Sequence, residues 1–242
     1  MAVLAPEKTD LAHPDSKTIQ KLFNAISPKY DFLNSFLSLG LHHAWRRHAV
    51  RRSLTGLERS ILDLGVGTGR SLRAFTSSHP FERAVGCDFS TTMLEQAGAF
   101  LKKEIHLVAC DFHSLPFASH SFDFATGSFI LRSVQNRAHF FEEIARILEP
   151  GGKVAFLELT RPRNRLVWEC VYKPYLRFYV PSVGKLFSRH EHAYEFLSQS
   201  VQSFVEPDLL SRELAAAGFH QVSIETFSLG IAALIQAKIK TP

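Results

Sequence analysis

The chain from residue 60 to residue 159 alternates short apolar runs with amphipathic stretches. Stretches with helical periodicity follow Gly69 and Ser90 and include the run RAHFFEEIARIL. The apolar runs are SILDL, RAVGCDF, IHLVAC, FDFATGSF and GGKVAFLEL. Because strands that alternate with helices are typical of parallel sheets covered by helices, the pattern predicts an α/β fold with a doubly wound, mostly parallel sheet.

The segments before and after this region complete the expected fold. Residues 18–53 have a helical pattern with a stop at Pro28, and they predict an N-terminal helical cap, residues 1–55, in one domain with residues 56–242. Residues 161–203 are expected to be a helical insertion before the last helix. The segment PDLLSRELAAAGFHQVSIETFSLGIAALIQAKI predicts that last helix, a glycine stop and two strands, which would close the sheet with an antiparallel edge. The length of 242 residues fits one globular domain better than two.

Composition indicates the cellular setting. No stretch approaches the ~20 apolar residues of a membrane span, and the start MAVLAPEKTDLAHPDSK lacks the apolar core of a secretory signal. Cys87, Cys110 and Cys170 are odd in number and not in CxxC spacing, so we expect free thiols in a reducing compartment. The formal charge of +5 is too small an excess to indicate nucleic acid. These features predict a cytoplasmic protein.

The segment ILDLGVGTGR ends the first predicted strand in a glycine turn. Gly65, Gly67 and Gly69 allow the backbone to turn sharply or to approach a ligand closely. A dinucleotide fingerprint has G-x-G-x-x-G spacing, whereas here the third glycine comes one position early and Arg70 follows. The Gly-Lys-Ser/Thr ending of a nucleoside-triphosphate loop is also absent. Both phosphate-binding interpretations are therefore weakened.

Three aspartates end three successive predicted strands and suggest another ligand. Asp63 precedes the glycines, where a carboxylate suits the ammonium of an amino acid moiety. Asp88 would accept hydrogen bonds from ribose hydroxyls, and Asp111 would meet the amine of an adenine that lies beside Phe112. Ammonium, ribose and adenine together describe S-adenosylmethionine. The alternative is that the three aspartates only cap the turns that follow them.

Longer motifs give a narrower identification. They are LFNAISPKYDFLNSFLSLGLHHAWRR, LPFASHSFD, RILEPGGKVAFLELTRP and AYEFLSQSVQSF. From about residue 20 onward the chain resembles the ubiquinone/menaquinone biosynthesis C-methyltransferases, a family of class I S-adenosylmethionine-dependent methyltransferases with a Rossmann-like sheet. The resemblance implies methylation of a ring carbon of a polyprenylated benzoquinol or naphthoquinol. The family's FGLRN is FILRS here, so Ile130 replaces a glycine and Ser133 an asparagine, which is expected to reshape the acceptor pocket.

The resemblance and the strand-end pattern together select candidate residues. Arg132 is expected to stabilise the phenolate that forms when a ring hydroxyl loses its proton, with a surface ion pair to Glu142 or Glu143 as the alternative. Tyr30 is expected to close over the site, and Asp31 either does the same or caps a helix. The catalytic candidates are Arg132 and Tyr30, and the cofactor-binding candidates are Tyr30, Asp63, Gly65, Gly67, Thr68, Gly69, Asp88, Phe89, Asp111, Phe112 and Ser128.

Two other patterns bear on partners. Neither His42 with His43 nor His190 with His192 has the spacing of a zinc site, so no metal is expected. Residues 161–189 hold seven Lys/Arg against one acid, interleaved with aromatic residues. This composition suits peripheral contact with the inner face of a membrane that carries a lipophilic quinol, with a solvated basic face as the alternative and nucleic acid ranked lower. The rival functions are methylation of another small aromatic metabolite and a noncatalytic methyltransferase-like subunit.

Overall fold

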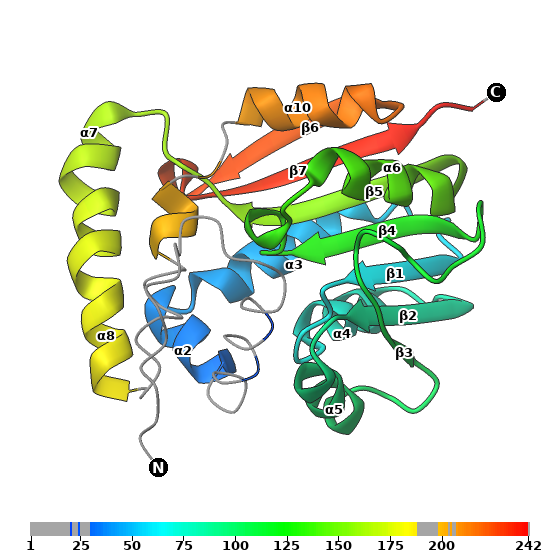
Figure 1. The fold of residues 1–242 in the computed structure, drawn as a ribbon, viewed down its shortest axis with the longest axis horizontal. Coiled ribbons are helices and arrows are strands. Elements are labelled where there is room, and N and C mark those ends of the chain that lie inside the picture. The colour runs from blue at the N-terminus through cyan, green and yellow to red at the C-terminus, as the bar shows by residue number, and fades with distance from the viewer. Residues whose placement is uncertain are drawn as a thin grey trace, which may run out of the picture.

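The computed structural model describes residues 20, 24, 30–187, 198–202, 204 and 207–241. These residues form a seven-stranded sheet in the order β3-β2-β1-β4-β5-β7-β6 (Figure 1). The strands from β3 to β5 are parallel, and β7 is antiparallel to both of its neighbours, β5 and β6. The strands are β1 (Ser60–Leu64), β2 (Arg83–Asp88), β3 (His106–Ala109), β4 (Phe122–Ser128), β5 (Leu148–Leu159), β6 (Phe219–Phe227) and β7 (Ala232–Ile239). The predicted mostly parallel sheet with an antiparallel edge is confirmed.

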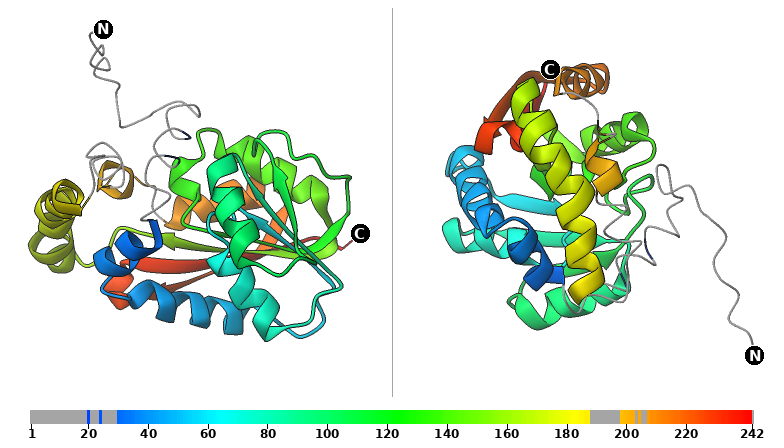
Figure 2. Two further views of the ribbon diagram at one scale, coloured as in Figure 1. Left: turned by 90° about the horizontal axis from the view of Figure 1, so that it is seen from below. Right: turned by 90° about the vertical axis from the view of Figure 1, so that its left-hand side faces the viewer.

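Helices cover both faces of the sheet (Figures 1 and 2). Successive side chains of a strand point to opposite faces, so Ile61 joins one apolar cluster while Leu62 and Leu64 join the other. The helices of the Ile61 face are α3 (Leu41–Ser53), α4 (Arg70–Ser78) and α5 (Thr91–Phe100), and those of the Leu62 face are α6 (Arg137–Ile147) and α10 (Pro207–Ala216). This arrangement confirms the doubly wound fold.

The N-terminal helical cap consists, in the described residues, of α2 (Tyr30–Leu37) and α3. The side chain of Trp45 is buried on the Ile61 face, and its Nε1 donates a hydrogen bond of 2.9 Å to Ser228 Oγ. Helix α3 is thereby attached to the turn between β6 and β7. The start of the predicted cap, apart from Gln20 and Asn24, lies outside the described residues.

A long helical insertion follows β5 and stands beside α2 (Figures 1 and 2). Its segments are α7 (Arg165–Val167), the π-helical η3 (Trp168–Tyr172) and η4 (Tyr175–Tyr179), and α8 (Val180–Phe187). The buried residues Trp168, Tyr172, Leu176 and Val180 recur every four residues and pack against Leu37 of α2. A strict four-residue period would drift around an α-helix of 3.6 residues per turn, and the wider π turns keep these side chains on one face.

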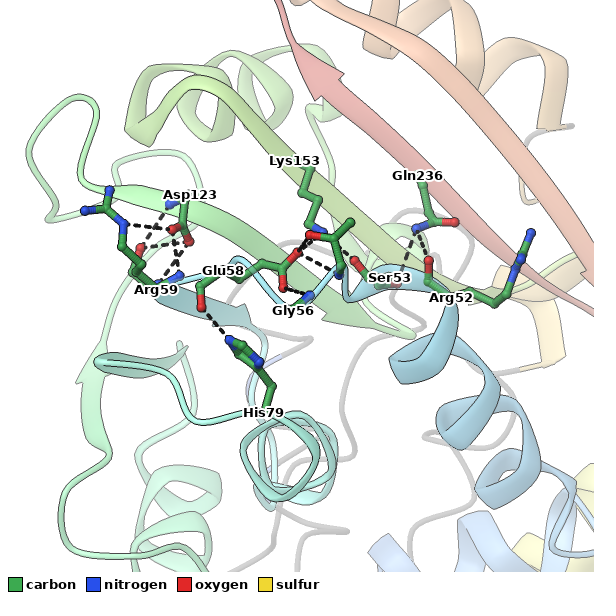
Figure 3. A network of polar contacts seen from close by, with 11 residues as sticks. Arg52, Ser53, Gly56, Glu58, Arg59, His79, Asp123, Lys153 and Gln236 are labelled. Carbon is green, nitrogen blue, oxygen red and sulfur yellow. Dashed lines mark hydrogen bonds and ion pairs between the residues drawn. The ribbon is translucent and has the colours of Figure 1, made fainter.

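A polar network fixes the amino ends of β1 and β4 (Figure 3). Asp123 of β4 accepts hydrogen bonds from the backbone nitrogens of Arg59, at 2.8 Å, and Ser60, at 3.0 Å. Next to it, the buried Glu58 forms an ion pair with Lys153 of β5. The strands therefore start in a fixed register at this edge, and their carboxyl ends meet at the opposite edge.

Candidate active site

The glycine turn after β1 uses backbone conformations that favour glycine. Gly65, Gly67 and Gly69 have φ values of 66°, 52° and 84°. A Cβ atom on Gly65 would lie 2.4 Å from Ile130 Cγ2, and one on Gly69 would lie 2.8 Å from Leu101 Cγ. On Gly67 the nearest atom would be 3.9 Å away. Packing therefore requires two of these glycines, whereas the third faces open space in which a ligand can approach the backbone.

Asp63 is a fully buried carboxylate at the carboxyl end of β1. Neither of its oxygens has a hydrogen-bond partner among the described residues. Burial is the main reason why the pKa of Asp63 is raised to about 8. The charge of Asp88 adds to the shift, and the charge of Arg46 and the Leu72 nitrogen oppose it. The Leu72 nitrogen belongs to the first turn of α4, so the turn-capping interpretation of Asp63 stays a prediction. A buried carboxylate without donors is costly and suits a ligand that brings them.

Asp88 connects the end of β2 to the glycine turn. Its Oδ2 accepts a hydrogen bond of 2.9 Å from the Gly67 nitrogen, and its Oδ1 accepts one of 2.9 Å from the Ser90 nitrogen. Burial raises the pKa of Asp88, and these two hydrogen bonds partly offset the shift. Asp88 therefore does cap its own turn, and each carboxylate oxygen keeps a second lone pair that can accept from a ligand hydroxyl.

Asp111 and Phe112 follow β3. Asp111 is exposed, and its Oδ1 accepts a hydrogen bond of 2.9 Å from the His113 nitrogen, which lowers the pKa of Asp111. It thus also caps a turn. The Phe112 ring packs edge-on against Phe89 at 6.4 Å between centroids. The tip of Phe112 lies 3.5 Å from where a Gly65 Cβ would be, so this ring reaches the glycine turn.

The N-terminal cap is tied to the glycine turn through Asp31. Its two carboxylate oxygens accept hydrogen bonds of 2.8 Å from Thr68 Oγ1 and Arg70 Nε. The carboxylate therefore faces the glycine turn, and the closing of Asp31 over the site stays a prediction. Tyr30 starts α2 one residue earlier, and its role stays a prediction.

Two further residues of the N-terminal segment contact the end of β2, and sequence reasoning missed both. The Gln20 side chain donates to the Phe89 carbonyl oxygen, and Ser90 Oγ donates to Asn24 Oδ1. No local signal in the sequence points to these contacts. At the end of β4, Ser128 Oγ lies 2.9 Å from Ser71 Oγ in the first turn of α4.

Arg132 lies on a short 3₁₀ turn, η2 (Leu131–Ser133), after β4. Its side chain is only 6% exposed, and its Nε donates a hydrogen bond of 2.7 Å to Glu158 Oε1 of β5. The predicted alternative of a surface ion pair is wrong: the side chain points back over the end of β5, and Glu143 pairs with Arg146 at 2.8 Å. Sequence reasoning missed Glu158, although an acid inside the apolar strand AFLEL is a signal that could have found it.

The residues between β4 and Arg132 are strained and tightly packed. Phe129 has a φ of 63°, which is rare for a bulky side chain, and its nitrogen donates a hydrogen bond of 2.7 Å to the Leu157 carbonyl oxygen. Such strain is typical of functional sites. Ile130 is buried, and a Cβ on Gly127 would lie 2.6 Å from its Cδ1. Ile130 also lies against Gly65, so the side chain that replaces the glycine of the FGLRN pattern fills the space between β4 and the glycine turn.

The histidines form no recognisable metal centre in the part of the chain that the structure describes. His42 is buried beside His43, and burial lowers the pKa of His42 to about 4. His190 and His192 lie outside the described residues. Within the same residues, no helix is long and apolar enough to cross a membrane.

Comparisons with known proteins identify the family of the chain. Residues 11–239 match the ubiE/COQ5 methyltransferase family. A demethylmenaquinone methyltransferase from Thermotoga maritima is 37% identical over 218 residues, which cover 90% of this chain and 94% of that protein. A ubiquinone/menaquinone biosynthesis C-methyltransferase UbiE from Desulfotalea psychrophila is 33% identical, with 88% and 86% covered. The matches confirm the family resemblance predicted from the motifs.

Solved structures share the fold at lower identity. The [4+2]-cyclase SpnF has a TM-score of 0.68 at 16% identity, covering 95% of this chain and 97% of the cyclase. A methyltransferase from Thermotoga maritima, described as S-adenosylmethionine-dependent and as a possible histamine N-methyltransferase, has a TM-score of 0.64 at 20% identity, covering 92% of this chain and all of that one. At these identities the likeness establishes the architecture alone.

Proposed function

Because the chain belongs to the ubiE/COQ5 methyltransferase family, we propose that it methylates a ring carbon of a reduced quinone with S-adenosylmethionine as methyl donor. In the structure, the observation that carries this proposal is the unpartnered, buried carboxylate of Asp63 beside the open face of Gly67. A carboxylate in need of donors and a backbone open to close approach fit the amino acid moiety of this cofactor. A demethylated benzoquinol or naphthoquinol is the proposed acceptor.

The strand-end residues would hold the cofactor along the edge of the sheet. Asp63 would pair with the ammonium group, and the free lone pairs of Asp88 would accept from the two ribose hydroxyls. Asp111 and Phe112 would contact the adenine. When bound, the cofactor supplies a sulfonium methyl group, which is already a strong electrophile. The protein therefore has mainly to align the acceptor carbon with this group and to exclude water.

Arg132 would act on the acceptor. A hydroquinone ring carbon becomes nucleophilic when a ring hydroxyl loses its proton, and a fixed guanidinium stabilises the phenolate that remains. Arg132 stands at the carboxyl end of β4, next to the strained Phe129. We further propose that Tyr30, at the start of the cap, closes the site against water.

The decisive experiment is a mass-spectrometric assay of methyl transfer to a panel of prenylated benzoquinols and naphthoquinols, with a soluble phenol as comparison. Methylation of a prenylated quinol supports the proposal. Methylation of the soluble phenol alone would favour the rival small-molecule methyltransferase. If S-adenosylmethionine gave the folded protein no thermal protection, the noncatalytic subunit would be favoured, since a ligand that binds the native state must stabilise it.

Within this assay, Arg132→Ala should lower the turnover rate by ~100-fold or more while the cofactor dissociation constant stays the same. Arg132→Lys should recover only part of the rate, because a point charge does not reproduce the planar fork. A wild-type rate in the alanine variant would remove Arg132 from the mechanism.

We also propose peripheral contact with an anionic membrane surface through the insertion. Leu166, Val171 and Phe178 are exposed apolar side chains there, and Arg165 and Arg177 are exposed cations beside them. Apolar anchors flanked by cations suit an anionic lipid interface. The test is sedimentation with anionic and with zwitterionic vesicles. Phe178→Ser should weaken the anionic association, and the same change at Leu57, exposed before β1, serves as control; equal binding to both vesicle types would contradict the proposal.

A further inference from the structure

We propose that Glu158 is a positioning residue, which holds the guanidinium group of Arg132 in the orientation that the methyl-transfer reaction needs. This inference rests on the proposed function for its catalytic consequence. The ion pair itself is a feature of the structure: Nε of Arg132 and Oε1 of Glu158 are 2.7 Å apart, and their side chains are 6% and 0% exposed.

The position of Glu158 is unusual for an acid. It lies between Leu157 and Leu159 in β5, a buried strand in which an apolar side chain would avoid the cost of removing a carboxylate from water. Its Oε1 accepts both from Arg132 and, at 2.8 Å, from the Leu159 nitrogen, which fixes the carboxylate relative to its own strand. Oε2 has no partner among the described residues. The carboxylate is therefore anchored on one side only, the side that faces Arg132.

The guanidinium group is held at two further points. Nη1 of Arg132 donates a hydrogen bond of 3.0 Å to Ser200 Oγ, and Nη2 lies 3.4 Å from the Phe129 carbonyl oxygen. With the bond to Glu158, contacts in three directions fix the plane of the fork. The contact to Phe129 also links Arg132 to the strained residue that ends β4, and such strain persists only where surrounding contacts enforce it.

The insertion borders the same pair. Burial raises the pKa of Tyr172, and the charges of Arg132 and Glu158 act on it in opposite directions, so this side chain lies within electrostatic reach of both. Tyr172 belongs to the π-helical part of the insertion, η3. The ion pair thus lies where the end of β4, β5 and the insertion meet.

Orientation is what Glu158 can add to Arg132. An arginine paired with a carboxylate is a neutral unit and attracts a distant anion less strongly than a lone arginine. A guanidinium fixed in advance, however, loses little freedom when the phenolate forms, and small misplacements of such a group cost large factors in rate. Glu158 therefore acts on turnover through Arg132 and not on cofactor binding.

The test compares Glu158→Asp with Glu158→Gln, alone and combined with Arg132→Gln. Glu158→Asp keeps the charge that compensates buried Arg132 but withdraws the carboxylate by one methylene, so the variant should fold and lose about 10-fold in kcat with little change in KM or cofactor affinity. The double variant Glu158→Gln/Arg132→Gln should be no slower than Arg132→Gln alone. The matched control is Glu213→Asp, which withdraws the carboxylate by one methylene from its 2.8 Å ion pair with Arg137, between α6 and α10, and should leave kcat unchanged.

A second measurement does not depend on turnover. The Nε–H resonance of Arg132, identified by its disappearance in Arg132→Lys, should shift or broaden in Glu158→Asp while the other arginine resonances stay in place. Wild-type kcat together with an unmoved Arg132 resonance would overturn the inference. If the wild-type protein methylated no quinol at all, the proposed function would fail, whereas the resonance would still decide whether Glu158 holds Arg132.

Discussion

Two buried carboxylates mark the two ends of β1, and their surroundings are opposite. Glu58 precedes the amino end of the strand and accepts hydrogen bonds from the Thr55 nitrogen, at 2.9 Å, the Gly56 nitrogen, at 3.1 Å, and Lys153 (Figure 3). Burial raises the pKa of Glu58, but the bonds from Lys153 and Thr55 outweigh it and lower the pKa to about 2. Asp63 has no such partner, and burial raises its pKa to about 8.

The difference shows that the two edges of the sheet have different roles. At the amino edge the protein satisfies its own buried charge, which fixes the start of the strands. At the carboxyl edge it leaves a carboxylate incomplete, so that a ligand with donors gains what the protein lacks. Ligands of doubly wound sheets bind at this edge in general. The contrast makes Glu58 the natural control for every experiment on Asp63.

The largest effect is expected from Glu58→Gln. The substitution removes the charge that compensates Lys153, whose side chain is largely buried, and breaking such a pair costs about 3 to 5 kcal/mol. Denaturant unfolding at pH 7 should show this loss. Because the folded pKa lies below the unfolded value, the contribution of Glu58 is present above about pH 4.5 and disappears as the pH falls toward about 2. The variant should therefore equal the wild type in stability only in strong acid, and its cofactor affinity should be normal wherever it is folded.

Asp63→Asn should have the opposite effects to Glu58→Gln: weaker cofactor binding and no loss of stability. An amide lacks the charge that would pair with an ammonium group, and a charge-assisted hydrogen bond is worth about 1.5 to 3 kcal/mol, so cofactor affinity should fall roughly 10- to 100-fold. The free energy of unfolding without cofactor should not fall at pH 8, because the wild-type carboxylate is unpaired there. Calorimetry and denaturant unfolding give both numbers. Lower stability with unchanged affinity would make Asp63 a structural residue like Glu58.

The two ends of β1 can also be compared through one backbone glycine at each end. Gly56, in the Glu58 network, and Gly67, in the glycine turn, have φ values of 87° and 52°, and a Cβ on either would be clear of other atoms by at least 3.9 Å. Alanine at either position should cost about 1 to 2 kcal/mol of stability through backbone strain. Only Gly67→Ala should also weaken the binding of the cofactor. Equal cofactor affinity in the two variants would mean that the open space over Gly67 is not the ligand site.

The carboxyl edge was largely predictable from sequence, and the physical reason is topological. Asp63, Asp88 and Asp111 each end an apolar run, and parallel strands bring such ends to one edge regardless of the details of packing. The sequence left open whether these acids cap turns. The structure shows that Asp88 and Asp111 do, whereas neither oxygen of Asp63 meets the geometry of a hydrogen bond among the described residues.

Contacts between distant segments were not predictable in the same way. The pairs Arg132–Glu158 and Asp31–Thr68 depend on the direction of individual side chains after the chain has turned, which a periodic pattern does not encode. The π turns of the insertion are another case, although the four-residue spacing of its buried side chains, starting at Trp168, is visible in retrospect. Ile130 shows what a motif does not predict. The sequence showed that Ile130 departs from the FGLRN pattern, but it did not show that this side chain packs on Gly65.

The smallest effect concerns the proton on Asp63. Since its folded pKa is raised to about 8, Asp63 is protonated in the ligand-free protein at pH 7. The contribution of Asp63 to stability is full below about pH 4 and is lost as the pH rises through about 8. An ammonium group selects the ionised carboxylate, so cofactor binding should release a proton, and the dissociation constant should fall about five-fold between pH 7 and pH 8. Calorimetry in two buffers of different ionisation enthalpy measures the released proton directly. Asp63→Asn should bind with neither the proton release nor this pH dependence, whereas Glu58→Gln should keep both. A wild-type affinity that did not change with pH would show that the carboxylate is already ionised before the cofactor arrives, and the contrast between the two ends of β1 would then lie in hydrogen bonding alone.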